Sequence, residues 1–312
     1  MGKASKHLLL ILPISFLISL LSFALLYFSP GDTALMLLRE KTGNTKITTE
    51  QAAEFAEQKG LDRTFFEMYG DWIGDVVKGD LGTSYVDGKS INEKIGNAFY
   101  KTFAMSFIAM LAYLVFGVTI GMYVAVHKNW IANKIANGWA VLSTAIPVFW
   151  IAMFFIWLFS VELGVLQTVG SRSSLNLVPP GLLMGTIYTG NMIVVVKEKT
   201  TLILEEPFVL HARAMGLKMG TIIKSHVLKN ILGPVIALSA LAFANFLGAS
   251  VLIERIFSIT GIGTLLNKAI GIKDYMVVAA SVLIIGIIIC AANMLSEAVY
   301  VLIDKREEDC KQ

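Results

Sequence analysis

The chain has 312 residues, of which 55% are hydrophobic and only 16% are charged, and its mean hydropathy is +0.69. Soluble domains usually contain about one quarter charged residues, and disordered chains combine low hydrophobicity with high charge, so this composition excludes both classes and predicts an integral membrane protein. The net charge of +3 is too small, and the basic residues are too scattered, to indicate a nucleic-acid partner.

Six apolar stretches are long enough to cross a hydrocarbon core of about 30 Å, which requires roughly 17 to 25 helical residues. In chain order they cover Leu8–Phe28, Phe103–Val126, Ile135–Phe159, Leu177–Val196, Ile231–Ile253 and Met276–Ile303. The first is longer than the apolar region of a cleavable signal peptide, roughly 7 to 15 residues, so we expect it to stay as an anchor. The sequence therefore predicts an all-α polytopic membrane protein with six transmembrane helices.

Basic residues between the spans predict the orientation, because short cytoplasmic loops are enriched in lysine and arginine. With both termini inside, the short cytoplasmic segments carry 13 Lys and Arg residues, and the two short external loops carry four. The remaining nine lie in a segment that is too long for the rule to govern. The count favours an N-in, C-in topology. This topology divides the chain into a tail with the first span (1–28), an external segment (29–101), a five-helix membrane core (102–303) and a cytoplasmic tail (304–312).

The external segment contains one clear amphipathic pattern. Phe65, Tyr69, Trp72 and Val76 recur at helical spacing, and Gly79 follows where a helix would stop. We expect this helix to lie against the membrane. Its apolar face could meet an external partner protein or could simply anchor the segment at the interface, and the sequence leaves both interpretations open.

The third span contains Pro147, and the fourth opens with two prolines and a glycine. Breaks of this kind are tolerated in membrane helices where neighbouring helices or a water-filled path satisfy the freed backbone groups. We therefore take Pro147, with Phe149 and Trp150 that follow it, as candidate residues of a translocation pathway.

Catalytic and nucleotide-binding motifs are missing from the sequence. The segment from Gly82 to Ser90 has five residues between its glycines where a phosphate-binding loop has four, and it lies in the external segment. The histidines and the two cysteines are too dispersed for a metal site. We therefore expect no catalytic residue, no bound metal and no cofactor on this chain, and we expect that any ATP is bound by another chain.

Glu297 is the acid that we place inside a span, near its cytoplasmic end. A buried charge in a membrane is functional by default, but a proton or ion relay usually uses several such groups at different depths. A lone acid near the end of a span favours a structural role.

The cytoplasmic loop from Lys197 to Asn230 is far longer than the 2 to 8 residues usual between packed helices, so it has structure of its own. Glu205 and Glu206 precede a proline and a helix-compatible run that ends at Gly216. Acids and proline at the start and glycine at the end predict a short helix. A second helical piece, Lys218 to Leu228, follows directly. The pair could be an ordinary surface hairpin or an element that docks onto a cytoplasmic partner.

Within this loop, the runs Ala212-Arg213-Ala214-Met215-Gly216 and His226-Val227-Leu228-Lys229-Asn230 are similar to the loop motif of a known transporter family. The chain resembles the integral membrane permeases of ABC importers, specifically the dipeptide/oligopeptide/nickel class. Further segments with this resemblance are Ser29–Asp32, Gly60–Asp62, Lys78–Ser84, Ile146–Trp150, Glu254–Phe257, Gly261–Gly263, Asp274–Tyr275 and Asn293 with Glu297 and Tyr300. Departures occur at Tyr100–Thr102, Gly233–Pro234 and Asp304–Arg306.

The resemblance implies a multi-pass cell membrane protein that works in a complex. Its expected partners are a second, related permease, two cytoplasmic ATPase subunits that hold ATP and Mg²⁺, an external substrate-binding protein and membrane lipid. The residues that it implies for ATPase docking and coupling are Glu205, Glu206, Phe208, Ala212, Arg213, Ala214 and Gly216.

The substrates of this class include peptides and nickel or nickel chelates, and we expect peptides here because the predicted external surface and the spans contain no histidine. An ion-coupled secondary transporter is the main alternative. It predicts inverted repeats and several charged residues at mid-membrane, and neither pattern is visible in the sequence. An intramembrane enzyme would require a catalytic cluster within the spans.

Overall fold

The computed structural model describes the backbone of residues 3–165 and 174–309 and the side chains of residues 13–165 and 176–294. Within these ranges the chain forms helices joined by turns, with an isolated β-bridge between Thr83 and Ser90. The all-helical prediction is confirmed for the described residues.

The described helices include three that are long and apolar enough to cross a membrane, over Ile91–His127, Met219–Ile256 and Tyr275–Met294. Two further pairs meet the same test together but are bent, by 105° between Trp130–Ala145 and Val148–Glu162 and by 49° between Val178–Ile187 and Thr189–Glu205. A shorter apolar helix covers Pro13–Tyr27. All six predicted stretches overlap one of these helices or pairs. The model therefore shows a polytopic membrane protein, and the count of six spans stays a prediction.

The chain divides into two compact units, whose boundaries fall within the long helices α5 (Ile91–His127) and α14 (Tyr275–Asp309) and in the connection at residues 258–259. The first unit comprises Met1–Thr102 and Ile259–Ala291, and the second comprises Phe103–Ser258 and Ala292–Gln312. These units are defined by packing, whereas the four regions expected from the sequence are defined by topology and stay a prediction.

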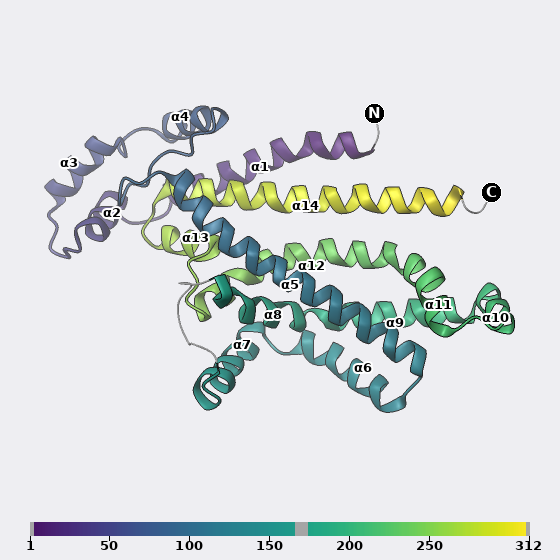
Figure 1. Cartoon of the computed structure of the whole chain (residues 1–312). Coiled ribbons are helices and arrows are strands. Elements are labelled where there is room, and N and C mark those ends of the chain that lie inside the picture. Colours follow the sequence, from purple (N-terminus) through teal and green to yellow (C-terminus); the bar gives the residue numbers. More distant parts are fainter. Residues whose placement is uncertain (1–2, 166–173, 310–312) are drawn as a thin grey trace. The chain divides into compact units, whose positions relative to one another are not determined.

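The first unit holds the external segment together with parts of the spans. Its helices are α1 (Lys3–Tyr27), α2 (Thr33–Thr42), α3 (Thr49–Lys59), α4 (Phe65–Val77), the start of α5, α13 (Ile262–Gly271) and the start of α14 (Figure 1). Helices α2 and α3 form a small hairpin whose core is Ala34, Leu37, Ala52 and Phe55. Local signals set the ends of α2. The Asp32 side chain accepts from the Leu35 amide at 3.0 Å, and Gly43 ends the helix at φ +67°.

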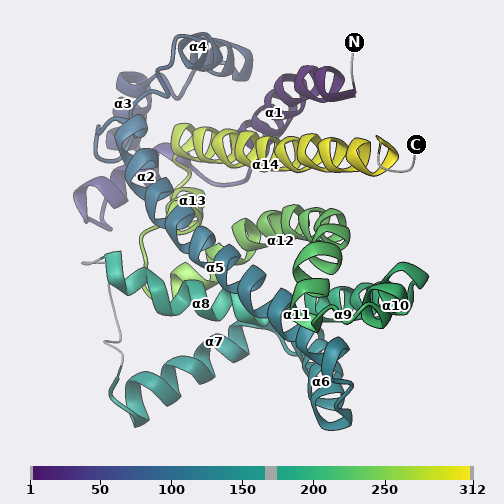
Figure 2. The same ribbon diagram turned by 45° about the vertical axis from the view of Figure 1, so that its right-hand side comes forward.

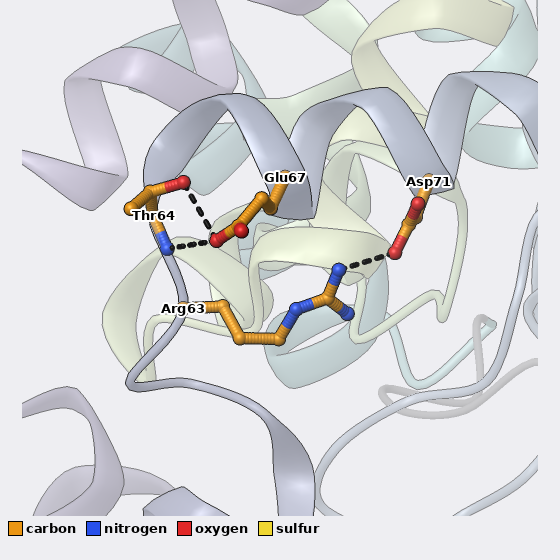
Figure 3. A network of polar contacts seen from close by, with 4 residues as sticks. All are labelled: Arg63, Thr64, Glu67 and Asp71. Carbon is orange, nitrogen blue, oxygen red and sulfur yellow. Dashed lines mark hydrogen bonds and ion pairs between the residues drawn. The ribbon is translucent and has the colours of Figure 1, made fainter.

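Helix α4 begins with a network of polar side chains (Figure 3). The Thr64 backbone amide and hydroxyl both donate to Glu67, at 3.0 Å and 2.7 Å, and these bonds hold the pKa of the Glu67 carboxyl below its usual range. Arg63 forms an ion pair with Asp71 one turn further along. These contacts fix where α4 starts, and Gly79 at φ +89° ends it as the sequence predicts.

The apolar face of α4 packs against α1 within the first unit. Tyr69 and Trp72 are almost fully buried, and their rings lie 5.6 Å and 6.4 Å from the ring of Phe23. The Tyr69 hydroxyl also lies 2.9 Å from the Ser19 hydroxyl. Helix α1 therefore covers the central residues of this face, and the expectation that α4 lies against the membrane stays a prediction.

The segment before α14 fastens the external segment within the first unit. Lys273 is 7% exposed and donates to the backbone carbonyls of residues 29–31 at 3.0, 2.6 and 3.1 Å. The Ser84 hydroxyl donates to Asp274 at 2.6 Å; burial raises the pKa of the Asp274 carboxyl, and this bond opposes that shift. Thr33 and Tyr275 share a further hydroxyl bond. Contacts across some 190 to 240 residues of sequence thus hold the external segment in place.

The second unit contains most of the membrane core. After α5 its elements are α6 (Trp130–Ala145), α7 (Val148–Ile156), the π-helical turn η1 (Trp157–Glu162), the 3₁₀ turn η2 (Ser174–Leu177), α8 (Val178–Ile187), α9 (Thr189–Glu205), α10 (Pro207–Ala214), α11 (Met219–Ile222), the π-helical turn η3 (Ile223–Val227) and α12 (Leu228–Ile256). The predicted third span is not one straight helix, because α6 ends at Ala145 and α7 restarts after Pro147 in another direction (Figures 1 and 2).

Glycines bring α5 into close contact with α8 and α9. Gly181 and Gly185, four residues apart on α8, face the backbone of α5, and Gly117 and Gly121, four apart on α5, face α9. A Cβ on Gly185 would lie 2.2 Å from the carbonyl oxygen of Ala109, and one on Gly121 would lie 2.9 Å from that of Ile193. Small residues at this spacing let membrane helices pack backbone to backbone.

Candidate functional site

The predicted cytoplasmic loop folds as two short helices between α9 and α12. Helix α9 runs on to Glu205, and Glu206 is extended, with φ −66° and ψ 142°, so that the chain turns before Pro207 begins α10. The proline occupies the first helical position, where its missing N–H costs nothing. The predicted first helix is confirmed, although Glu205 belongs to the preceding helix.

Gly216 ends α10 as predicted. Its φ is +84°, its amide donates to the Arg213 carbonyl at 2.9 Å, and the Leu217 amide donates to the Ala212 carbonyl at 3.2 Å. This pair of bonds is a Schellman motif, in which the residue after the helix adopts the left-handed conformation that glycine favours. The turn that orients the two loop helices therefore depends on Gly216.

The second helical piece is continuous with the fifth span. Residues Met219–Ile256 form one helical run through α11, η3 and α12. The sequence predicts separate elements at Lys218–Leu228 and Ile231–Ile253, so the break expected between them is absent from the structure. The loop is therefore attached directly to a membrane helix.

Six of the seven residues proposed for docking are exposed, and Ala212 is buried. Ala212 and Val209 form the inner face of α10, with 5% and 0% exposure. Phe208 is 44% exposed, and its ring lies 5.5 Å from that of His226 on η3. Exposed apolar side chains at Leu210, Met215 and Leu217 extend this surface. The loop presents an apolar surface with basic residues. This surface lies on the side of the second unit where α9 ends and α12 begins.

The candidate pathway residues lie together at the break between α6 and α7. Pro147 precedes α7, and Phe149 and Trp150 follow on its first turn, 41% and 64% exposed, with rings 6.4 Å apart. Further along α7 and η1, Met153, Phe154 and Trp157 are also exposed. The structure groups the three candidates, and their role in a pathway stays a proposal.

The structure reveals a buried acid that sequence reasoning placed just beyond the fifth span. Glu254 lies in the last turns of α12 and has no exposed surface, one turn after the equally buried Ser250. The four-residue spacing places the two polar residues on one face of a helix, but it does not distinguish a buried face from an exposed one. The side chain of Glu297 lies outside the described residues, so its structural role stays a prediction.

Comparison with known proteins identifies the family. A family model described as the binding-protein-dependent transport system inner membrane component matches residues 117–309, which is more than half of the chain and includes the whole loop. The chain belongs to this family. It is an inner membrane permease of an ABC importer and a multi-pass cell membrane protein.

The curated relatives of this ABC importer permease include glutathione transport system permease proteins GsiC. Those of Shigella flexneri serotype 5b, Escherichia coli strain K12 and Pectobacterium atrosepticum are each 29% identical over 299 residues, which is 96% of both chains. A solved structure of the MetNI methionine ABC transporter in an inward-facing conformation matches with a TM-score of 0.53 and 18% identity. It covers 67% of this chain and 95% of that chain. This likeness shows that the permease shares its fold.

Proposed function

We propose that this permease forms half of the translocation pathway for small peptides in an ATP-driven importer, beside a second, related permease. An external binding protein delivers the substrate, and two cytoplasmic ATPase subunits bind ATP and Mg²⁺. The relatives named as glutathione permeases support a peptide substrate, because glutathione is a tripeptide and the likeness extends over 96% of both chains.

The observation that carries the proposal is the loop between α9 and α12. Its exposed residues Glu205, Glu206, Phe208, Arg213 and Ala214 form the docking surface, whereas buried Ala212 and left-handed Gly216 set its shape. Because the loop continues into α12 as one helical run, closure of the ATPase subunits would tilt that span. Movement of the docking surface would then reach the membrane through this continuous helix, which can adopt two arrangements.

We place part of the pathway wall at the break between α6 and α7. The bend at Pro147 interrupts the backbone hydrogen bonds of the third span, and freed backbone groups are tolerated at membrane depth where they line a cavity. Phe149 and Trp150 would then form part of its wall. Peptides carry apolar side chains, which suits aromatic residues at this position.

Transport by the purified importer tests this function. The complex in lipid vesicles, with its binding protein outside, is expected to accumulate labelled glutathione or dipeptides only when ATP is inside. Uptake that persists without ATP and collapses when a proton gradient is dissipated would favour the ion-coupled secondary transporter instead. Accumulation of Ni²⁺ but of no peptide would keep the importer and replace the substrate.

Cysteine labelling tests the N-in, C-in topology. In a cysteine-free background, single cysteines at Lys199 and Thr221 are expected to resist a membrane-impermeant thiol reagent in intact cells, and one at Thr45 is expected to react. All three positions are exposed in the structure, so burial cannot mimic protection. Permeabilised cells provide the control, because all three sites should then react. External labelling at Lys199 would contradict the orientation and the docking surface together.

A further inference from the structure

The second unit has a groove of about 700 Å³ between the end of α5, the start of α6 and the end of α9. Lys128, Lys197 and Glu198 line it with Trp130, Asn133 and Thr201. Lys197 is held in place, because its ammonium group donates to the side-chain oxygens of Asn133 at 3.2 Å and Asn137 at 2.8 Å. The first groove therefore has a fixed cation in its wall, beside apolar side chains.

A second groove of about 460 Å³ adjoins the first at Val124, which lines both. Its wall is apolar and includes Phe116, Ile120, Ile135 and Trp139. Polar side chains in this wall form hydrogen bonds within the protein. The Trp139 indole donates to the Thr189 hydroxyl at 2.9 Å, and that hydroxyl donates to the Thr186 carbonyl at 2.7 Å. The second groove therefore offers mainly apolar surface.

Along α5 the apolar groove comes first and the groove with the lysines follows. The acyl chain and the headgroup of a phospholipid lie in the same order within one leaflet. From Phe116 to His127, which precedes Lys128, the helix rises about 16 Å, which is close to the roughly 15 Å depth of one hydrocarbon leaflet. Trp130, 66% exposed, marks the polar end, with the Lys134 ammonium 3.9 Å from its ring centroid. Tryptophan and lysine at this level are typical of the membrane interface.

The charges at the polar end favour an anionic ligand. Lys128 and Lys197 line the groove with Glu198, and Lys134 stands beside Trp130. Glu205 lies 4.0 Å from Lys128, but both side chains are more than half exposed, so this pair is weak and leaves Lys128 able to bind another anion. Three lysines therefore outnumber two glutamates near this end of the grooves.

We propose that these grooves bind one anionic glycerophospholipid, with its phosphodiester at Lys128 and Lys197 and one acyl chain along Phe116, Ile120 and Ile135. In the N-in, C-in topology proposed above, this lipid lies in the cytoplasmic leaflet, so its position rests on that proposal. Because α9 leads directly into the docking loop, the bound lipid would sit beside the element that couples ATP hydrolysis to transport.

Photolabelling of the complete importer tests this site. The complex is placed in phosphatidylcholine nanodiscs that contain a small fraction of phosphatidylglycerol with a diazirine in its acyl chain. This probe is expected to label peptides that contain residues 116–124 and 132–139 several-fold more than phosphatidylcholine with the same chain. Lys128→Gln and Lys197→Gln should each reduce the labelling roughly fivefold, the effect expected for one lysine near an anionic lipid.

Lys199→Gln is the matched control, because Lys199 is exposed on the same helix and does not line the groove. Lys128→Gln is the cleaner variant, since Lys197 also joins α9 to α6. Equal labelling by both lipids, or no labelling because the partner permease covers the groove, would overturn the proposal. So would an equal loss with Lys199→Gln. Site labelling that persists in a complex that does not transport peptides would contradict the proposed function alone.

Discussion

Replacing Gly216 with valine is expected to reduce uptake severely while the permease still inserts into the membrane and pairs with its partner. Gly216 has φ +84°, a conformation that costs an L-residue roughly 1 to 2 kcal/mol and is worse for a β-branched side chain. Nothing lies within 4 Å of a Cβ placed there, so the damage comes from the backbone and not from a clash. The chain would leave the left-handed region, and α10 would change its angle to α11.

Two measurements on the purified complex check this result. Uptake into vesicles should fall severely, and ATP hydrolysis should stop responding to the substrate-loaded binding protein. Gly216→Asn should retain more activity, because asparagine tolerates the left-handed region. Gly220→Val is the control in the same loop, since Gly220 has no positive φ and also has open space around it. Full uptake with stimulated hydrolysis in Gly216→Val would remove the loop from the coupling mechanism.

Gly185→Ala is expected to prevent correct packing of the membrane core, although it adds only one methyl group. The new Cβ would lie 2.2 Å from the carbonyl oxygen of Ala109 and 2.7 Å from the Cβ of Ala112. These atoms belong to the backbone and to a side chain without rotamers, so α5 and α8 must move apart. Overpacking of this kind costs typically 1 to 3 kcal/mol and sometimes more.

The expected readout is a lower melting temperature of the detergent-purified complex and less permease in the membrane. Gly248→Ala on α12 is the matched control, because the added Cβ meets nothing within 4 Å. Alanine there is expected to preserve or raise stability, since it is the better helix former by about 1 kcal/mol. An unchanged melting temperature for Gly185→Ala would show that α5 and α8 are not in contact in the assembled importer.

The two substitutions separate the coupling loop from the membrane core. Gly216 lies between two short helices that make up the surface proposed for the ATPase, so its loss should leave stability almost intact and remove coupling. Gly185 lies where two membrane helices meet, so its loss should reduce the amount of folded protein. Activity per folded complex distinguishes the two outcomes.

The amino-acid sequence was enough to predict the class of protein, the approximate positions of the apolar helices and the family. It also determined the short helix of the loop with its stop at Gly216, and the end of α4 at Gly79, both of which the structure confirms. These features depend on length, hydrophobicity and residue preferences within a few positions of the chain. Such signals act locally and can be recognised without knowing what packs nearby.

Features that depend on distant partners became visible only in the folded structure. The sequence showed a proline in the third span but not the 105° bend, and it contained the spacings of Gly117 with Gly121 and Gly181 with Gly185 without indicating which helices they join. The burial of Glu254 could not be read from its position after the fifth span.

The bonds from Lys273 to residues 29–31 join parts of the chain about 240 residues apart. The local conformational preference of a lysine is nearly the same whether its ammonium group faces water or three carbonyl groups. Its place is set by the free energy of satisfying buried polar groups, and that free energy exists only once the distant segments have come together.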